Sequence, residues 1–93
     1  MTDPCDLPAT EARRLIGQKR LSPTELLDSC LARIAAVNPT VNAMVAMDEG
    51  AARATAKQVE AALAKGEALG PLAGLPLGIK DLEETKGLRT TWG

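Results

Sequence analysis

The sequence predicts an α/β fold, and three observations predict it. An apolar pattern of helical period occurs in three places, a pattern of period two occurs once between them, and a short apolar run follows a loop rich in glycine and proline. The resulting order of helix, helix, strand, helix and strand is typical of the edge of an α/β protein. With 93 residues the chain has room for one small domain at most. Its core is expected to be thin, because Trp92 is the only aromatic residue.

The first half of the chain predicts two helices. Residues 1–8 contain two prolines and two aspartates and are expected to form a flexible lead-in. A short amphipathic helix is expected at about residues 10–17, where Gly17 is placed to end it. A second helix is expected at residues 22–37, because Ser22, Pro23 and Glu25 form a capping box with proline at the first helical position. Its apolar stripe comprises Leu26, Leu27, Cys30, Leu31, Ile34 and Val37, and Asn38-Pro39 is expected to stop it.

The second half predicts a strand, a helix and a second strand. Alternating side chains over residues 41–47 predict a strand that is covered on at least one face. Asp48 can cap a helix over residues 48–65, and Gly66 follows where a left-handed residue is needed. A loop then leads to a short strand at residues 77–80, in which Gly78 would let another backbone or a ligand approach closely.

Composition narrows the classes of function. The net charge is −1 and no run of like charges is long, so direct partners among nucleic acids and anionic membranes are not expected. The chain has no histidine, the commonest general base and metal ligand. Cys5 and Cys30 have no metal-site or redox-motif spacing and are expected to be free thiols. No apolar stretch signals export or a membrane span, so a cytoplasmic protein is expected.

Lys80 is the residue most suited to acid-base chemistry. It ends an apolar run that contains Leu77 and Ile79, and burial in such surroundings lowers the pKa of a lysine until it can act as a base. Asp81 would oppose that shift if its carboxylate faced the amine. From these residues alone, a surface lysine at the end of a strand remains the alternative.

A wider set of positions resembles the opening of the amidase signature family, in which Gly-x-Pro is followed by Lys-Asp, Gly, Thr-Thr and Gly. The matching positions are Gly74, Pro76, Lys80, Asp81, Gly87, Thr90, Thr91 and Gly93. Residues 20–27 and 34–43 are similar to the N-terminal helical part of the same family. The resemblance implies that residues 9–93 are the N-terminal segment of an amidase domain, with helices followed by the first strands of a mixed sheet, and that this α/β/α fold is incomplete as given.

The resemblance also implies a chemistry. Amidase signature enzymes hydrolyse a carboxamide to an acid and ammonia or an amine through a Ser-Ser-Lys triad, and Lys80 matches the lysine base. Asp81, Gly78, Thr90 and Thr91 would support the site structurally. The resemblance implies neither a metal nor an organic cofactor. The two serines of the chain cannot complete the triad, because Ser22 is expected to cap a helix and Ser29 lies within one. The chain is therefore expected to be a fragment that is inactive alone, part of an enzyme acting on a small-molecule amide that the sequence does not identify.

Two alternatives stay open at this point. One is the amidase subunit of a tRNA-dependent amidotransferase, which shares the same motif. The other is a non-catalytic helical fragment that forms homo-oligomers through exposed apolar helix faces.

Overall fold

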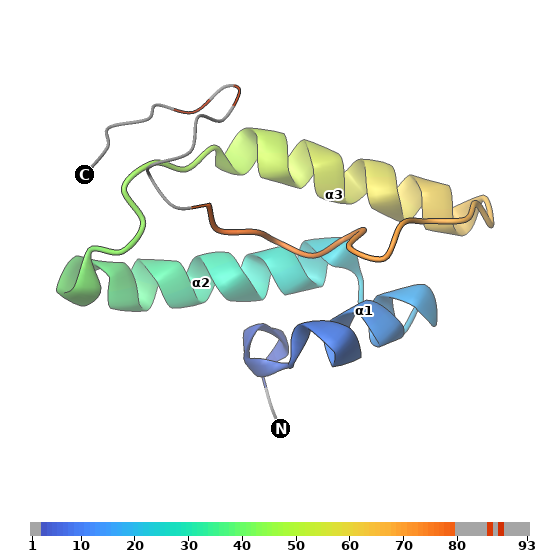
Figure 1. Ribbon diagram of the computed structural model, residues 1–93, viewed down its shortest axis with the longest axis horizontal. Helices are drawn as coiled ribbons and strands as arrows, with labels where there is room; N and C mark the ends of the chain where they lie inside the picture. Colours follow the sequence, from blue (N-terminus) through green and yellow to red (C-terminus); the bar gives the residue numbers. More distant parts are fainter. Residues whose placement is uncertain (1–2, 80–85, 87, 89–93) are drawn as a thin grey trace.

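The computed structural model describes residues 3–79, 86 and 88 of the chain. The fold comprises a 3₁₀ helix η1 (Pro4–Asp6) and the α-helices α1 (Ala9–Gly17), α2 (Pro23–Val41) and α3 (Glu49–Ala64). Figure 1 shows α2 and α3 side by side and running in opposite directions, with η1 and α1 below α2. The segment after α3 turns back and runs along the α2 and α3 pair (Figure 1).

Helix α2 begins at the predicted capping box. The Ser22 hydroxyl accepts a hydrogen bond from the Glu25 backbone N–H at 3.0 Å, and the Ser22 N–H donates to Glu25 Oε1 at 3.2 Å. Helix α3 has the predicted Asp48 cap, whose Oδ1 accepts from the Ala51 N–H at 2.9 Å. These side chains satisfy N–H groups that have no partner within the helix, which explains why both helices start where the sequence indicated.

Helices α1 and α3 are both followed by a residue in the left-handed conformation, but that residue is a lysine after α1 and a glycine after α3. Gly66 has φ +76° and ends α3 in the predicted left-handed conformation. At the end of α1 the left-handed position belongs to Lys19, with φ 60°, while Gly17 is the last helical residue. The Lys19 N–H donates to the Ile16 carbonyl at 3.0 Å and the Arg20 N–H to the Leu15 carbonyl at 2.9 Å, which is the Schellman pattern. A lysine therefore occupies a conformation that favours glycine.

The predicted stop of α2 at residue 37 is wrong, because the helix continues through Pro39 to Val41. Proline removes one N–H, but Ala35 and Pro39 are exposed, so the carbonyl left without that donor can bond to water. Asn42 ends the helix in the left-handed conformation, with φ 49°. The Asn38 side chain then bonds both backbone groups of Met44, accepting from its N–H at 2.9 Å and donating to its carbonyl at 3.0 Å.

The predicted strand at residues 41–47 is also wrong, and residues 3–79 contain no β-strand. Val41 belongs to α2, and residues 42–48 have no regular secondary structure. The Asn38 amide takes the place of a partner strand at Met44. At the second predicted strand, 77–80, residues 77–79 form no strand, and Lys80 is not among the described residues. The described part is helical, and the α/β expectation is not confirmed for it.

The core lies where α1 meets the first turns of α2. Ala12, Ile16, Leu21 and Leu26 form a buried cluster in which Ile16 has no exposed surface. Of the predicted stripe along α2 only Leu26 and Leu27 are buried, and Val37 is 41% exposed. Residues 3–7, expected as a flexible lead-in, contain η1 and contact α2. Within the described ranges, no helix combines the length and the apolar character that a membrane crossing requires.

Candidate functional site

Most of the predicted site residues lie outside the described part of the chain. Lys80, Asp81, Thr90 and Thr91 lie outside the described residues, and their roles stay predictions. Gly78 is described and exposed, and a Cβ built on it would meet no atom within 4 Å. The close approach expected at Gly78 is thus not seen among the described atoms.

The segment that leads toward Lys80 is anchored at a turn over residues 70–75. The Ala73 N–H donates to the Gly70 carbonyl at 3.2 Å, and the Leu75 N–H donates to the Leu72 carbonyl at 3.1 Å. The Arg13 guanidinium of α1 also donates to the Gly70 carbonyl, through Nε at 3.2 Å and Nη2 at 3.1 Å. These bonds fix the start of the motif segment to the N-terminal helices.

Gly74 allows this turn to lie directly on the core. Its φ is +86°, and a Cβ built there would lie 3.1 Å from Ile16 Cδ1 and 3.2 Å from Pro23 Cγ. Both the backbone conformation and the short distance to the core favour glycine. The first glycine of the family motif therefore has a packing role that can be read from described atoms.

Beyond the turn the segment leaves the core. Leu75 packs against the core cluster, whereas Leu77 is 78% exposed and Ile79 is 54% exposed. The apolar surroundings that Lys80 needs for a lowered pKa are therefore not supplied by burial of these two neighbours in the described part of the chain.

An apolar groove of about 420 Å³ lies between α2 and α3 and is bordered by the motif segment. The α2 side is formed by Leu27, Leu31 and Ile34, and the α3 side includes Ala52 and Val59. Met47, Leu75, Leu77 and the described Lys86 and Leu88 also line it. Few polar groups face this groove, and no cluster of potential metal ligands occurs among the described residues. The self-association expected from exposed apolar helix faces stays a prediction.

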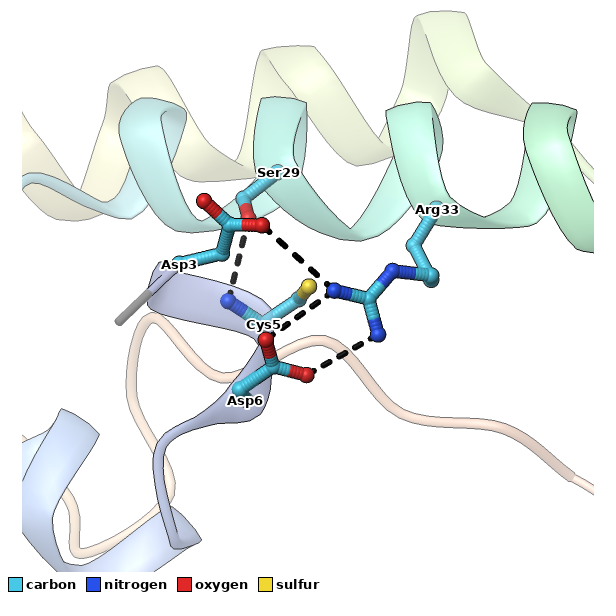
Figure 2. Close-up of polar contacts among 5 residues, drawn as sticks. All are labelled: Asp3, Cys5, Asp6, Ser29 and Arg33. Atoms are coloured by element: carbon cyan, nitrogen blue, oxygen red, sulfur yellow. Dashed lines mark hydrogen bonds and ion pairs between the residues drawn. The ribbon is translucent and has the colours of Figure 1, made fainter. Parts of the chain in front are cut away.

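The two serines have structural partners. Ser22 forms the cap of α2, and the Ser29 hydroxyl accepts a hydrogen bond from the Cys5 N–H at 3.0 Å (Figure 2). Figure 2 also shows Arg33 binding the Asp6 carboxylate with two hydrogen bonds, of 2.9 and 3.0 Å, while Asp3 lies 3.5 Å from the same guanidinium. η1 is therefore attached to α2 by both polar and charged contacts.

Two carboxyl groups at contacts between helices have lowered pKa values. Hydrogen bonding to Arg33 lowers the pKa of Asp6. Hydrogen bonding to Thr24, from its side chain and its backbone, lowers the pKa of Glu60, whose Oε1 accepts from the Thr24 N–H at 2.8 Å. This bond places an α3 carboxylate at the N-terminus of α2, where a negative charge is stabilised. Burial raises the pKa of the Cys30 thiol.

Sequence reasoning did not identify Arg33 or Glu60 as contact residues. Both are ordinary charged residues of an exposed helix face in the sequence pattern, and their partners lie 27 and 36 positions away. No local signal links such positions, so only the packing of η1 and α3 on α2 reveals them.

Comparison with known proteins adds a family. The family model described as Amidase matches residues 25–93. The A subunit of glutamyl-tRNA(Gln) amidotransferase from Roseiflexus castenholzii is 45% identical over 91 residues, which cover 98% of this chain and 18% of that protein. The proteins of the same name from Acidothermus cellulolyticus and Prochlorococcus marinus are 43% identical over 93 residues and 49% identical over 81 residues. The match to the Acidothermus protein covers 100% of this chain and 18% of that protein, and the match to the Prochlorococcus protein covers 87% of this chain and 17% of that protein.

The chain thus spans less than a fifth of the length of these curated relatives. No solved structure matches it.

Proposed function

The chain belongs to the amidase family, and we propose that it supplies the N-terminal helices and the lysine base of an amidase subunit of the glutamyl-tRNA(Gln) amidotransferase type. The observation that carries this proposal is the 45% identity to such a protein over 98% of the chain. The activity would be the release of ammonia from a carboxamide donor, followed by its transfer to glutamyl-tRNA(Gln) with the help of partner subunits.

Lys80 would act as the general base of a Ser-Ser-Lys relay. In this mechanism the neutral amine accepts a proton from a relay serine, which in turn takes the proton of the nucleophilic serine as that oxygen attacks the amide carbonyl. Ser22 and Ser29 are engaged in a helix cap and in the η1 contact, so neither is offered as a nucleophile. The purified chain of residues 1–93 is accordingly expected to turn over no amide.

A free-standing amidohydrolase is the second candidate, favoured by the description of the matching family model as Amidase. It would use Lys80 in the same way but release its product without an acceptor tRNA or a partner protein. The two candidates differ in whether ammonia release depends on glutamyl-tRNA(Gln) and on co-purifying partner subunits.

The role of Lys80 is tested in a longer protein, one that contains this chain and also the part of the relatives that this chain does not span. Lys80→Arg keeps a positive charge but cannot lose its proton at any usable pH, so kcat/KM for an amide substrate should fall by several orders of magnitude, about as far as in Lys80→Ala. Lys86→Arg is the matched control, because Lys86 is exposed, and it should leave kcat/KM unchanged. An arginine variant at position 80 that keeps more than about a tenth of the activity, a loss under roughly 1.4 kcal/mol, would exclude the general base role.

The same preparations distinguish the two candidates. An amidotransferase of this type should release ammonia from glutamine and pass it to glutamyl-tRNA(Gln) when its partner subunits are present. Hydrolysis of simple amides at full rate, without partner subunits and with no response to glutamyl-tRNA(Gln), would favour the amidohydrolase.

A further inference from the structure

The 3₁₀ helix η1 brings Cys5 next to the turn of α2 that contains Cys30. The Cys5 N–H is bonded to the hydroxyl of Ser29, the residue immediately before Cys30. The next residue after Cys5, Asp6, is held by Arg33, three positions after Cys30. Figure 2 shows Cys5 between these two anchors, Ser29 and Arg33.

Helix geometry places Cys30 and Ser29 each beside Arg33. Residues three and four apart are neighbours on a helix surface, so Arg33 adjoins both Cys30 and Ser29. Ser29, Cys30 and Arg33 therefore form one small patch of α2, and η1 is fixed over it by hydrogen bonds on two sides. Cys30 also packs against the core cluster, which restricts its motion.

Electrostatics agrees with this placement. The pKa of the Cys30 thiol is raised first by burial and then by the charge of Cys5, while Arg33 opposes the shift. The charge of Cys5 also acts on Arg33. The two sulfur atoms are thus close enough for one to affect the ionisation of the other.

We propose that Cys5 and Cys30, which are free thiols in this structure, form a reversible disulfide by exchange with a low-molecular-weight disulfide such as oxidised glutathione. The Cys5 thiolate attacks one sulfur of glutathione disulfide, a mixed disulfide forms, and one glutathione thiolate leaves. The Cys30 thiol then loses its proton and attacks the Cys5 sulfur, and the second glutathione leaves. Two protein thiols are oxidised by two electrons and one glutathione disulfide is reduced to two thiols.

The bond would cross-link the N-terminal core. It would close a loop that contains α1 and the capping box of α2, including the buried Ile16. Constraining that loop in the unfolded chain should raise the melting temperature by on the order of 10–20 °C, and reduction should reverse the change. The cross-link needs no part of the proposed amide chemistry and can be tested separately from it.

The experiment equilibrates the purified chain of residues 1–93 with mixtures of reduced and oxidised glutathione, with and without a denaturing concentration of guanidinium chloride. Free thiols are blocked by alkylation, and intact mass together with the tryptic peptide that links Cys5 to Cys30 gives the fraction bridged. We expect the native chain to show an effective concentration of the thiol pair at least about tenfold above that of the denatured chain. Cys30→Ser should instead accumulate one glutathione on Cys5.

Two further variants test the role of the η1 contact. Arg33→Ala removes the hydrogen bonds to Asp6 and should lower the native effective concentration roughly threefold to tenfold. Arg53→Ala removes a different exposed ion pair, that with Asp28, and should leave it unchanged. Equal native and denatured values, mixed or intermolecular disulfides in place of the Cys5–Cys30 link, or an Arg33→Ala variant with no loss would each overturn the proposal.

Discussion

The two ends of the helical assembly use apolar residues in opposite ways. Where α1 meets the start of α2, Ile16 is fully buried and its neighbours close around it. Toward the other end, the apolar residues of α2 and α3 border an open groove, and Val37, Val41 and Val45 are 41%, 58% and 60% exposed. The apolar residues of the first region are buried by contacts with one another. In the second region, apolar surface is not covered by any of the described residues.

This difference in burial indicates which part of the chain contributes most to its stability. Burial of apolar area contributes about 25 cal/mol per Å², so the closed end should account for most of the unfolding free energy. The motif segment joins the two regions, because Gly74 and Leu75 lie on the core while Leu77 and Ile79 are exposed.

The largest expected effect comes from the closed end. Ile16→Ala removes a side chain with no exposed surface and should lower the unfolding free energy by about 3–4 kcal/mol. Ile34→Ala, in the groove, removes a half-buried side chain and should cost roughly 1 kcal/mol or less. Urea unfolding followed by circular dichroism measures both changes. If Ile16→Ala does not fold, Ile16→Val should still lose about 0.5–1.5 kcal/mol, and equal losses at positions 16 and 34 would contradict the comparison.

The next effect tests the joint between the two regions. Gly74→Ala introduces a Cβ at 3.1 Å from Ile16 Cδ1 and a side chain at a positive φ, so it should cost about 2 kcal/mol or more. Gly78→Ala is the matched control, because its Cβ would meet nothing within 4 Å, and it should change stability by less than about 0.5 kcal/mol. A tolerated alanine at position 74 would mean that the turn does not rest on the core.

An intermediate effect concerns the bond between α3 and the start of α2. The folded-state pKa of Glu60 lies below its ordinary value of 4.5, because Thr24 bonds the charged form. Its stabilisation is therefore complete above that ordinary value and is lost as the pH falls through the folded-state pKa. Glu60→Gln should cost on the order of 1 kcal/mol at neutral pH and almost nothing in acid.

Unfolding free energies of the wild type and the Glu60→Gln variant, measured from neutral pH down to about pH 3, give the difference that belongs to Glu60. Asp6 and Glu11 also have lowered pKa values, but they titrate in both proteins and cancel. A difference that stays constant with pH would contradict the assignment.

Local signals predicted the helices better than they predicted their ends or neighbours. The capping box at Ser22 and the Asp48 cap were readable because each satisfies backbone groups within three residues. The sequence wrongly predicted a strand at residues 41–47, because alternation alone does not reveal whether a partner strand exists. Here the Asn38 side chain bonds the Met44 backbone instead. Pro39 led to a wrong prediction of the end of α2, because an exposed last turn tolerates the missing N–H donor.

The candidate site was predictable only as a motif. The Gly-x-Pro and Lys-Asp pattern indicated the family, which the match over residues 25–93 confirms. The roles predicted for Lys80, Asp81, Thr90 and Thr91 would depend on residues far away in sequence, and local patterns carry no information about such contacts. Gly74 is the exception, because its requirement for glycine arises from Ile16 and Pro23 on the described core.

The smallest expected effect is a gain in stability at the closed end. Lys19 holds φ 60° after α1, a conformation that is costly for a residue with a side chain, so Lys19→Gly should raise the unfolding free energy by about 0.5–1 kcal/mol even after the greater freedom of glycine in the unfolded chain is counted. Asn42→Gly at the opposite end is the control. Asn42 has φ 49°, but asparagine tolerates this region, so the change there should be close to zero. Urea midpoints at constant slope measure both, and a loss of stability in Lys19→Gly would mean that the lysine side chain makes a contact more favourable than its backbone is strained.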